Sequence, residues 1–448
     1  MKTLIKDVTL ITMNPSREVF PGYLVVEDNI ITEIGRGKAP VHSHQPHRFD
    51  KIVPGKGRIA LPGFVQTHVH LCQTLFRGQA DDLQLMDWLR KRIWPLEAAH
   101  DEESIYISAQ LGIAELIRGG TTAIVDMETV HHTECAIRAL QESGMRALVG
   151  KVMMDTGGNV PTGLQENTNE SIEESVRLLE KWNGYDNGRI RYAFAPRFVI
   201  SCSDDLLTEV GKLSRHYNVP VHTHASENRE EISLVEVTRG MRNIQFLQKI
   251  GLTGPNLILA HCIWLDDSEK RILADDQVKV THCPSSNLKL ASGFCPVPEL
   301  QSMGVHVSLG ADGAPCGNNL DMFLEMRLAA LIHKPTNGET SMSAYTVLEM
   351  ATLGGARAMG LEQEIGSLEA GKKADLILVN LEKPSAYPSV STDPVSRLVY
   401  SGKSSDVEWV MIDGKVVLDE GKLLTLSERE ILRKADAAIL RLLKKAGI

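Results

Sequence analysis

The sequence predicts an α/β protein in which a (β/α)8 TIM-type barrel carries a small β-sandwich domain formed by both chain ends. Two patterns support this prediction. From residue 59 onwards, eight short apolar runs alternate with longer stretches of helical periodicity, which is typical of repeated βα units. Strand-like patterns precede residue 58 and return after about residue 368. We therefore expect residues 59–367 to form the barrel, and residues 1–58 with 368–448 to form the smaller, discontinuous domain.

The chain ends contain the strands expected for the smaller domain. Residues 22–35 have the pattern of a hairpin that turns near Asp28. The apolar runs 374–380 and 407–418 predict further strands, which we expect to pair with the N-terminal ones. The tail, residues 427–443, is amphipathic and predicts a terminal helix packed on the protein. A polar stretch also contains three histidines, which we interpret as a solvated loop rather than a second metal site: His42, His44 and His47.

Polar or titratable residues stand at the end of every apolar run of the predicted barrel. The runs end near His68, Asp126, Asp155, Arg197, His224, His261, His282 and Asp312. Helices are predicted between them, for example over residues 171–182, 204–216 and 319–333. The carboxyl ends of barrel strands form one rim, where the active sites of such barrels lie. Polar groups that converge there are difficult to explain as packing, because buried polar side chains need partners.

Composition excludes several classes of function. The formal charge of −9 and the absence of basic runs argue against a nucleic-acid partner. No stretch of about 20 apolar residues exists to span a bilayer, and the first seven residues carry charge where a signal peptide would be apolar. The seven scattered cysteines lack a C-x-x-C pair, which favours free thiols. We therefore expect a cytoplasmic protein with no membrane contact.

The first predicted barrel strand ends in two histidines, His68 and His70. Side chains alternate along a strand, so these two imidazoles face the same way and can bind one metal ion. By itself an H-x-H pair is a weak motif, and packed or surface histidines are the alternative. The other polar strand ends on the same rim favour a metal site.

Four features together resemble the amidohydrolase superfamily. They are His68-x-His70 after the first strand, His224-Ala-Ser-Glu227, His261 after the sixth strand and Asp312 after the eighth. Within the superfamily the chain is similar to the branch of guanine deaminase, of the methylthioadenosine, S-adenosylhomocysteine and 5′-deoxyadenosine deaminases, and of the triazine chlorohydrolases. The segment 365–378, where the barrel returns to the smaller domain, is also similar to this family.

The resemblance implies one divalent metal ion per chain, Zn²⁺ first and Fe²⁺ second, with an open position for water. It assigns the metal to His68, His70, His224 and Asp312. Catalytic roles fall to Asp312, which takes a proton from water, to His261, which stabilises the tetrahedral centre, and to Glu227, which protonates a ring nitrogen.

We expect a site for one metal ion, because the sequence lacks a lysine that sites for two metal ions contain. Members of the superfamily with two metals carry a lysine at the end of the fourth strand. Here that position reads Ala195-Pro196-Arg197. Lys151 lies on the third run, and we interpret it as a structural lysine.

The substrate-binding residues implied by the resemblance fall into two groups. Gln73 and Arg197 resemble residues with which guanine deaminases hold the purine. Trp94 and Glu97 lie in a segment similar to the adenosine-derivative deaminases, where the matching glutamate binds the ribose hydroxyls. Those enzymes usually carry a histidine where Arg197 stands. His282 is a further candidate for the pocket wall, with a core histidine as the alternative.

The resemblance therefore implies a hydrolytic deaminase that removes the exocyclic amine of an aminopurine. An adenosine derivative is the first choice of substrate, and guanine deaminase is the close alternative. A triazine amino- or chlorohydrolase would use the same site, and a non-enzymatic scaffold is disfavoured by the intact set of ligands. The expected partner is thus a small aminated heterocycle, and we expect the chain to form a homo-oligomer.

Overall fold

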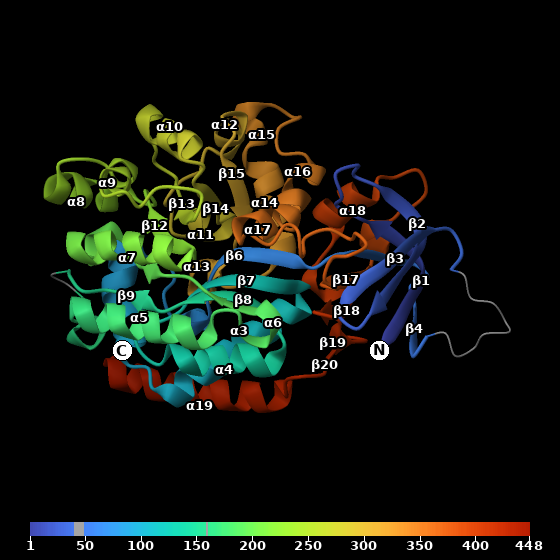
Figure 1. Ribbon diagram of the computed structural model, residues 1–448, viewed down its shortest axis with the longest axis horizontal. Coiled ribbons are helices and arrows are strands. Elements are labelled where there is room, and N and C mark those ends of the chain that lie inside the picture. Colours follow the sequence, from blue (N-terminus) through green and yellow to red (C-terminus); the bar gives the residue numbers. More distant parts are fainter. Residues whose placement is uncertain (40–48, 158–159) are drawn as a thin grey trace.

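Parallel strands at the centre of the molecule and a nine-stranded sheet at one end make up the fold (Figure 1). The computed structural model describes residues 1–39, 49–157 and 160–448. The histidine-containing loop interpreted from the sequence lies outside the described residues, so that interpretation stays a prediction for His42, His44 and His47.

The parallel strands form two main sheets, ordered β10-β8-β7-β6-β16 and β12-β13-β14-β15. A parallel bridge between Phe194 and Val221 links them on one side, and β16 follows β15 directly on the other. A two-stranded pair, β9 with β11, continues β8 and β10. Each predicted run contains one of these strands or two consecutive short ones: β6 (Phe64–His70), β7 (Thr121–Met127), β8 (Arg146–Gly150), β9 (Val152–Met153), β10 (Ile190–Tyr192), β11 (Ala195–Pro196), β12 (Val221–Ala225), β13 (Leu257–His261), β14 (Lys279–His282), β15 (His306–Leu309) and β16 (Asp312–Gly313).

Helices connect successive parallel strands and cover their outer side, which confirms the mixed α/β content (Figure 1). The helices predicted over 171–182, 204–216 and 319–333 are confirmed as α5, α7 and α14. The main connecting helices are α3 (Glu102–Arg118), α4 (Thr133–Ser143), α5 (Thr168–Trp182), α7 (Asp204–Tyr217), α8 (Arg229–Arg239), α9 (Asn243–Lys249), α10 (Asp267–Asp275), α12 (Val297–Ser302), α14 (Met322–Ile332), α16 (Ala344–Met350) and α17 (Leu353–Ala358).

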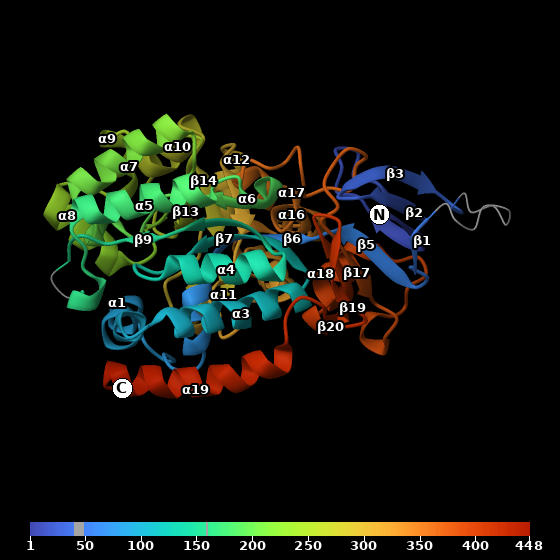
Figure 2. The same ribbon diagram turned by 60° about the horizontal axis from the view of Figure 1, so that its bottom comes forward.

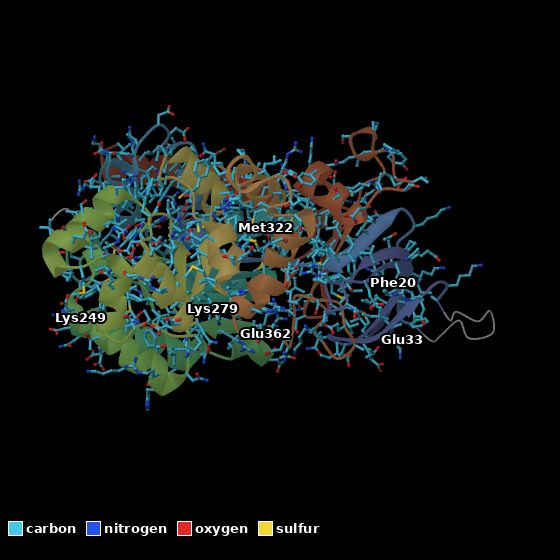
Figure 3. The ribbon with its side chains drawn as sticks, turned by 90° about the horizontal axis from the view of Figure 1, so that it is seen from above. Phe20, Glu33, Lys249, Lys279, Met322 and Glu362 are labelled. Atoms are coloured by element: carbon cyan, nitrogen blue, oxygen red, sulfur yellow. The ribbon has the colours of Figure 1, made fainter. Side chains whose placement is uncertain are left out.

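Both chain ends contribute to the nine-stranded sheet. Its order is β20-β19-β18-β17-β5-β1-β2-β3, with β4 paired to β1. The predicted hairpin near Asp28 is confirmed, because β2 ends at Glu27 and pairs antiparallel with β3. In Figure 3, Phe20 and Glu33 mark this sheet, and Lys249 marks the opposite end of the molecule. The strands are β1 (Lys2–Ile11), β2 (Val19–Glu27), β3 (Ile30–Arg36), β4 (Lys51–Pro54), β5 (Arg58–Pro62), β17 (Leu376–Asn380), β18 (Val407–Ile412), β19 (Lys415–Asp419) and β20 (Lys422–Leu423).

The predicted terminal helix is confirmed as α19 (Glu428–Ala446). It lies along α3, away from the nine-stranded sheet (Figure 2). Its buried side chains Ala435, Ala438 and Leu442 belong to an apolar cluster that also contains Leu96 and Ile107. The C-terminal segment therefore leaves the sheet and packs against helices near the parallel strands.

The cysteines and the helices bear on two expectations drawn from composition. All seven cysteines are buried free thiols, as predicted. Within the described ranges, no helix combines the length and apolar character needed to cross a membrane.

Close packing fixes the strand that carries the paired histidines. A Cβ added at Gly310 would lie 2.7 Å from the backbone oxygen of His68, so only glycine lets the chain pass this close to β6. Beside it, the buried hydroxyl of Thr67 contacts those of Thr281 and Ser308 at 2.9 and 2.7 Å. These contacts join β6 to β14 and β15 and leave little freedom for the end of β6.

A buried ion pair ties the nine-stranded sheet to the parallel strands. Arg146, at the start of β8, donates from Nε and Nη2 to the carboxylate of Asp375 at 2.6 and 2.9 Å. Both side chains are 1% exposed. Asp375 also accepts the backbone N–H of Asp413 at 2.7 Å, so it connects β8 with the turn after β18.

We predict that Asp375→Ala lowers the free energy of unfolding by about 3–5 kcal/mol, because it leaves the buried guanidinium of Arg146 with only its longer contact to Asp413, at 3.4 Å. Urea denaturation would measure the change. Glu174→Ala is the matched control, since it removes an exposed partner of Arg177 and should cost less than about 1 kcal/mol. Equal losses in the two variants would contradict the prediction.

Candidate metal centre and active site

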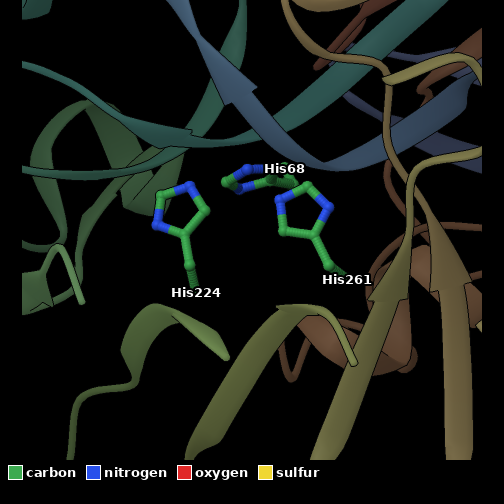
Figure 4. A group of neighbouring side chains, drawn as sticks. All are labelled: His68, His224 and His261. Carbon is green, nitrogen blue, oxygen red and sulfur yellow. The ribbon is translucent and has the colours of Figure 1, made fainter. Parts of the chain in front are cut away.

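Four histidines and one aspartate meet at the carboxyl ends of the parallel strands. His68 and His70 come from β6, His224 from β12, His261 from β13 and Asp312 from β16. Nε2 of His70 lies 3.3 Å from Oδ1 of Asp312 and 3.3 Å from Nε2 of His224. Nε2 of His68 lies 3.4 Å from the same aspartate oxygen. The rings of His68, His224 and His261 surround a common space (Figure 4).

The outer ring nitrogen of each histidine has a hydrogen-bonding neighbour. In three rings Nδ1 donates to an oxygen, and the acceptors for His70, His224 and His261 are Met127 O at 2.7 Å, Arg197 O at 2.8 Å and Asn287 Oδ1 at 2.9 Å. Nδ1 of His68 lies 3.0 Å from Nε2 of His222. A proton held on Nδ1 leaves the lone pair of Nε2 free, so these contacts direct the inner nitrogens towards the common space.

The donor set at this centre fits a divalent metal ion. The ligand atoms of His68, His70 and Asp312 lie within 4.8 Å of one another, as do those of His68, His224 and His261. Nε2 of His68 and of His261 are buried and have no hydrogen-bond partner among the described residues. Buried polar atoms without partners are costly, and inward lone pairs of imidazole and carboxylate are the ligands that zinc and similar ions bind.

Burial lowers the pKa of three histidines of the centre, and a contact with His68 lowers that of Asp312. Desolvation lowers the pKa of His70 to about 3 and that of His261 to about 4, and it lowers the pKa of His224 well below its ordinary value. Burial alone would raise the pKa of Asp312, but its interaction with His68 holds that pKa well below the usual range. The neutral imidazoles of His70, His224 and His261 and an ionised Asp312 therefore face the common space.

Glu227 lies beside this centre, and the pKa of its carboxyl group shifts in the opposite direction to that of Asp312. It lies three residues after His224, and its Oε2 is 3.6 Å from Nε2 of His261. Burial, followed by the nearby charge of Asp312, raises the pKa of Glu227 well above its ordinary value. Glu231 accepts the backbone N–H of Glu227 at 2.9 Å and so holds the turn before α8. A buried carboxyl group whose pKa is raised in this way suits a general acid.

The short helix α11 (Pro284–Lys289) carries Ser286 and Asn287, whose contacts with the site the sequence did not predict. Ser286 donates from Oγ to Oδ2 of Asp312 at 2.6 Å, and Asn287 accepts from His261. Glu325 anchors the helix by accepting the backbone N–H of Ser285 at 3.0 Å. The sequence does not indicate these contacts, because α14, which carries Glu325, meets α11 only in the tertiary structure.

A narrow cavity opens onto the inner nitrogens. Gln73 and Arg197, two of the predicted substrate-binding residues, line it, and so does Glu227. The remaining walls are largely apolar and aromatic, and they come from Leu85, Trp88, Leu89, Phe198 and Leu290. Phe198 stacks on the ring of His224 with centroids 4.3 Å apart.

Glu97 is joined to Gln73 and Arg197 and lies outside the set of residues that line the cavity. Nη2 of Arg197 donates to Oε1 of Glu97 at 3.1 Å, and Nη1 donates to the other carboxylate oxygen. Nε2 of Gln73 donates to Oε1 at 2.9 Å. The residues that the sequence divided between two substrates thus form one buried network, in which Glu97 lies behind the other two.

Comparisons with known proteins agree with this geometry. The amidohydrolase family matches residues 59–417. A 5′-deoxyadenosine deaminase of Methanobrevibacter smithii is 40% identical over 437 residues, which cover 97% of each chain. The chain belongs to the amidohydrolase family. The resemblance expected from the sequence is therefore confirmed.

A second relative in sequence and two solved structures also carry the names of deaminases. A 5-methylthioadenosine/S-adenosylhomocysteine deaminase of Syntrophomonas wolfei subsp. wolfei is 39% identical and covers 99% of this chain and 100% of its own. The crystal structure of an adenosine deaminase from Xanthomonas campestris with bound zinc has a TM-score of 0.91 and 34% identity, with 99% of this chain and 98% of that chain covered. E. coli guanine deaminase has a TM-score of 0.82 and 28% identity, with 93% and 99% covered. This amidohydrolase is accordingly a hydrolase of carbon–nitrogen bonds in cyclic amidines.

Three predicted side chains lie away from the cavity of this amidohydrolase. Trp94 lines a separate cavity between the segment around Met86 and α8. His282 is buried beside His333, with ring centroids 5.4 Å apart, and neither of its ring nitrogens has a partner in the described part of the chain. Lys151 donates to Val152 O at 3.0 Å and pairs with Glu166. Their roles in substrate binding or structure stay predictions.

Proposed function

We propose that this protein is a metal-dependent hydrolytic deaminase that removes the exocyclic amine of an adenosine derivative. 5′-Deoxyadenosine, methylthioadenosine and S-adenosylhomocysteine are the substrates that the relatives' names favour. The observation that carries the proposal is the convergence of three groups. A buried carboxyl group on Glu227, the imidazole of His261 and the ionised carboxylate of Asp312 meet at the cavity beside the inward histidine nitrogens.

One divalent ion, zinc first and iron(II) second, would be held by Nε2 of His68, His70 and His224 and by Asp312. Support comes from the inward lone pairs of these residues and from the zinc-bound adenosine deaminase of similar fold. When bound, such an ion lowers the pKa of a water molecule towards neutrality and so supplies a nucleophile.

Asp312 and Glu227 then carry out the proton transfers. Asp312 accepts a proton from the attacking water, and Glu227 donates its proton to the ring nitrogen next to the aminated carbon, which makes that carbon electrophilic. Nε2 of His261 lies 3.6 Å from Glu227 and 3.9 Å from Oδ2 of Asp312, so its imidazole faces the oxygen that adds to the carbon. Asp312 passes its proton to the amine, which leaves as ammonia, and the proton of the added hydroxyl returns to Glu227 as the carbonyl of the product forms.

Deamination of guanine is the second candidate. The cavity wall favours it, because Gln73 and Arg197 line the cavity while Glu97 lies behind them. Oε1 of Gln73 and Nε of Arg197 are buried without partners among the described residues, so they present an acceptor and a donor to a ring edge. For a nucleoside, Glu97 has to share its carboxylate between Arg197 and the ribose hydroxyls.

We also propose that the chain folds into an eight-stranded barrel and a smaller β-sandwich domain. The strand order, closed by the bridge at Phe194 and by β16 on β6, supports an eight-stranded barrel over residues 59–367. The sheet built from both chain ends supports a smaller β-sandwich domain over residues 1–58 and 368–448. The cytoplasmic location and the homo-oligomer stay predictions.

We predict that the purified protein contains about one divalent metal ion per chain, because the two groups of candidate ligands found among the described residues share His68 and surround one position. Elemental analysis would measure the content. Chelation should abolish ammonia release and lower the melting temperature, since a ligand of the folded state stabilises it, and Zn²⁺ should restore both. Two ions per chain, or full activity of the metal-free protein, would contradict the mononuclear site.

We predict that Glu227→Gln lowers kcat by roughly 10²-fold or more and retains the metal, because a positioned proton donor contributes that much. Steady-state kinetics and metal analysis would check both effects. Glu236→Gln, on the exposed side of α8, is the control and should behave like the parent protein. Parental kcat in Glu227→Gln would show that another group is the acid.

We predict that 5′-deoxyadenosine or methylthioadenosine is deaminated with a higher kcat/KM than guanine, as measured by ammonia release. In Glu97→Gln the value for the nucleoside should fall about tenfold to a hundredfold, since hydrogen bonds to a charged group contribute about 1.5–3 kcal/mol. Glu166→Gln breaks a comparably buried pair with Lys151 and controls for general loosening. Turnover of guanine alone would establish the second candidate.

A further inference from the structure

His68 differs from the other three histidines of the centre in what holds its outer nitrogen. The oxygens that contact Nδ1 of His70, His224 and His261 can only accept, so they dictate a proton on that nitrogen. Nδ1 of His68 instead lies 3.0 Å from Nε2 of His222. A neutral imidazole nitrogen either donates or accepts, so this contact admits two positions for one proton.

The two arrangements have different consequences for the centre. If His68 donates, its Nε2 keeps a free lone pair, and the proton of His222 lies on Nδ1. If His222 donates, His68 carries its own proton on Nε2, which lies 3.4 Å from Oδ1 of Asp312. Only the first arrangement makes His68 a metal ligand, because a ligating nitrogen is unprotonated. The net charge of the pair is the same in both.

We propose that His222 is a positioning residue of the metal site: it accepts a hydrogen bond from Nδ1 of His68 and thereby directs the lone pair on Nε2 of His68 to the metal. His222 is 1% exposed, and its ring stands perpendicular to that of His68, with centroids 4.9 Å apart. It precedes His224 by two residues on β12, so alternation along the strand places both side chains on one face. β12 thus supplies one ligand and orients another.

The surroundings of His222 make this arrangement depend on the metal. Nδ1 of His222 has no hydrogen-bond partner in the described ranges, so the proton placed there is an unpaired buried donor. Such a donor costs free energy. Ligation of His68 offsets that cost in the loaded protein, whereas the metal-free protein can adopt the other arrangement. A carbonyl acceptor, such as the one that holds His70, would allow no such change.

Metal affinity tests the inference without relying on turnover. His222→Leu removes the acceptor and retains a buried side chain of similar size, and it should weaken Zn²⁺ binding about 10- to 100-fold in competition with a chelator. His222→Gln places an amide oxygen at a similar distance from the backbone and should stay within a few-fold of the parent. His306→Leu is the control: it breaks a partly buried hydrogen bond to Gly354 O, 2.7 Å long, at the opposite end of β15, and should leave affinity unchanged. Parental affinity in His222→Leu would overturn the proposal.

A second measurement uses the unaltered chain, in case His222→Leu fails to fold. Nitrogen NMR of histidine-labelled protein distinguishes the two tautomers of each ring. In the zinc-loaded protein, His222 should carry its proton on Nδ1 and accept at Nε2, and this tautomer should be less populated after chelation. A proton on Nε2 of His222 in the loaded protein would overturn the proposal.

This inference rests on the metal site of the proposed function, and the two can fail separately. A parent protein that binds no Zn²⁺ would disprove the metal site itself. A parent that binds Zn²⁺ tightly, together with a His222→Leu variant that binds it equally well, would disprove only the role of His222.

Discussion

The structure depends on one constraint: several inward lone pairs must be held a few ångströms apart inside a protein that excludes water. Imidazole nitrogens this close have no mutual attraction, so the backbone must position them. The end of β6 is accordingly fixed by the approach of Gly310 to His68 and by the hydroxyl contacts of Thr67. Hydrogen bonds on the outer nitrogens then orient the rings, and burial keeps the imidazoles of His70 and His224 neutral.

Arg197 links the metal centre to the substrate wall. Its backbone oxygen accepts a hydrogen bond from Nδ1 of His224, and its guanidinium pairs with Glu97 while also lining the cavity. A displacement at the end of β11 would therefore move both a ligand and the polar wall. Through Glu97, Gln73 belongs to the same buried network as Arg197.

Much of the site followed from the sequence because parallel strands end on one rim. The spacing of His68 and His70 indicated a shared face, and the polar strand ends indicated convergence, which the placement of His261 and Asp312 bears out. The same H-x-H spacing occurs in His222 and His224 and could have drawn attention to His222. The family resemblance then supplied chemical roles that spacing alone does not carry.

The sequence by itself determined the alternation of strands and helices, the rim and the set of ligand types, because these depend on periodicity and residue chemistry. Only the tertiary structure decided which groups share a hydrogen bond across distant segments. Glu97 and Arg197 lie 100 residues apart, and nothing in the sequence indicates that these two charges pair. The contacts of Ser286 and Asn287 likewise depend on how α11 packs against α14. Such pairings follow from the packing of whole elements, since burial leaves each polar group with few available partners.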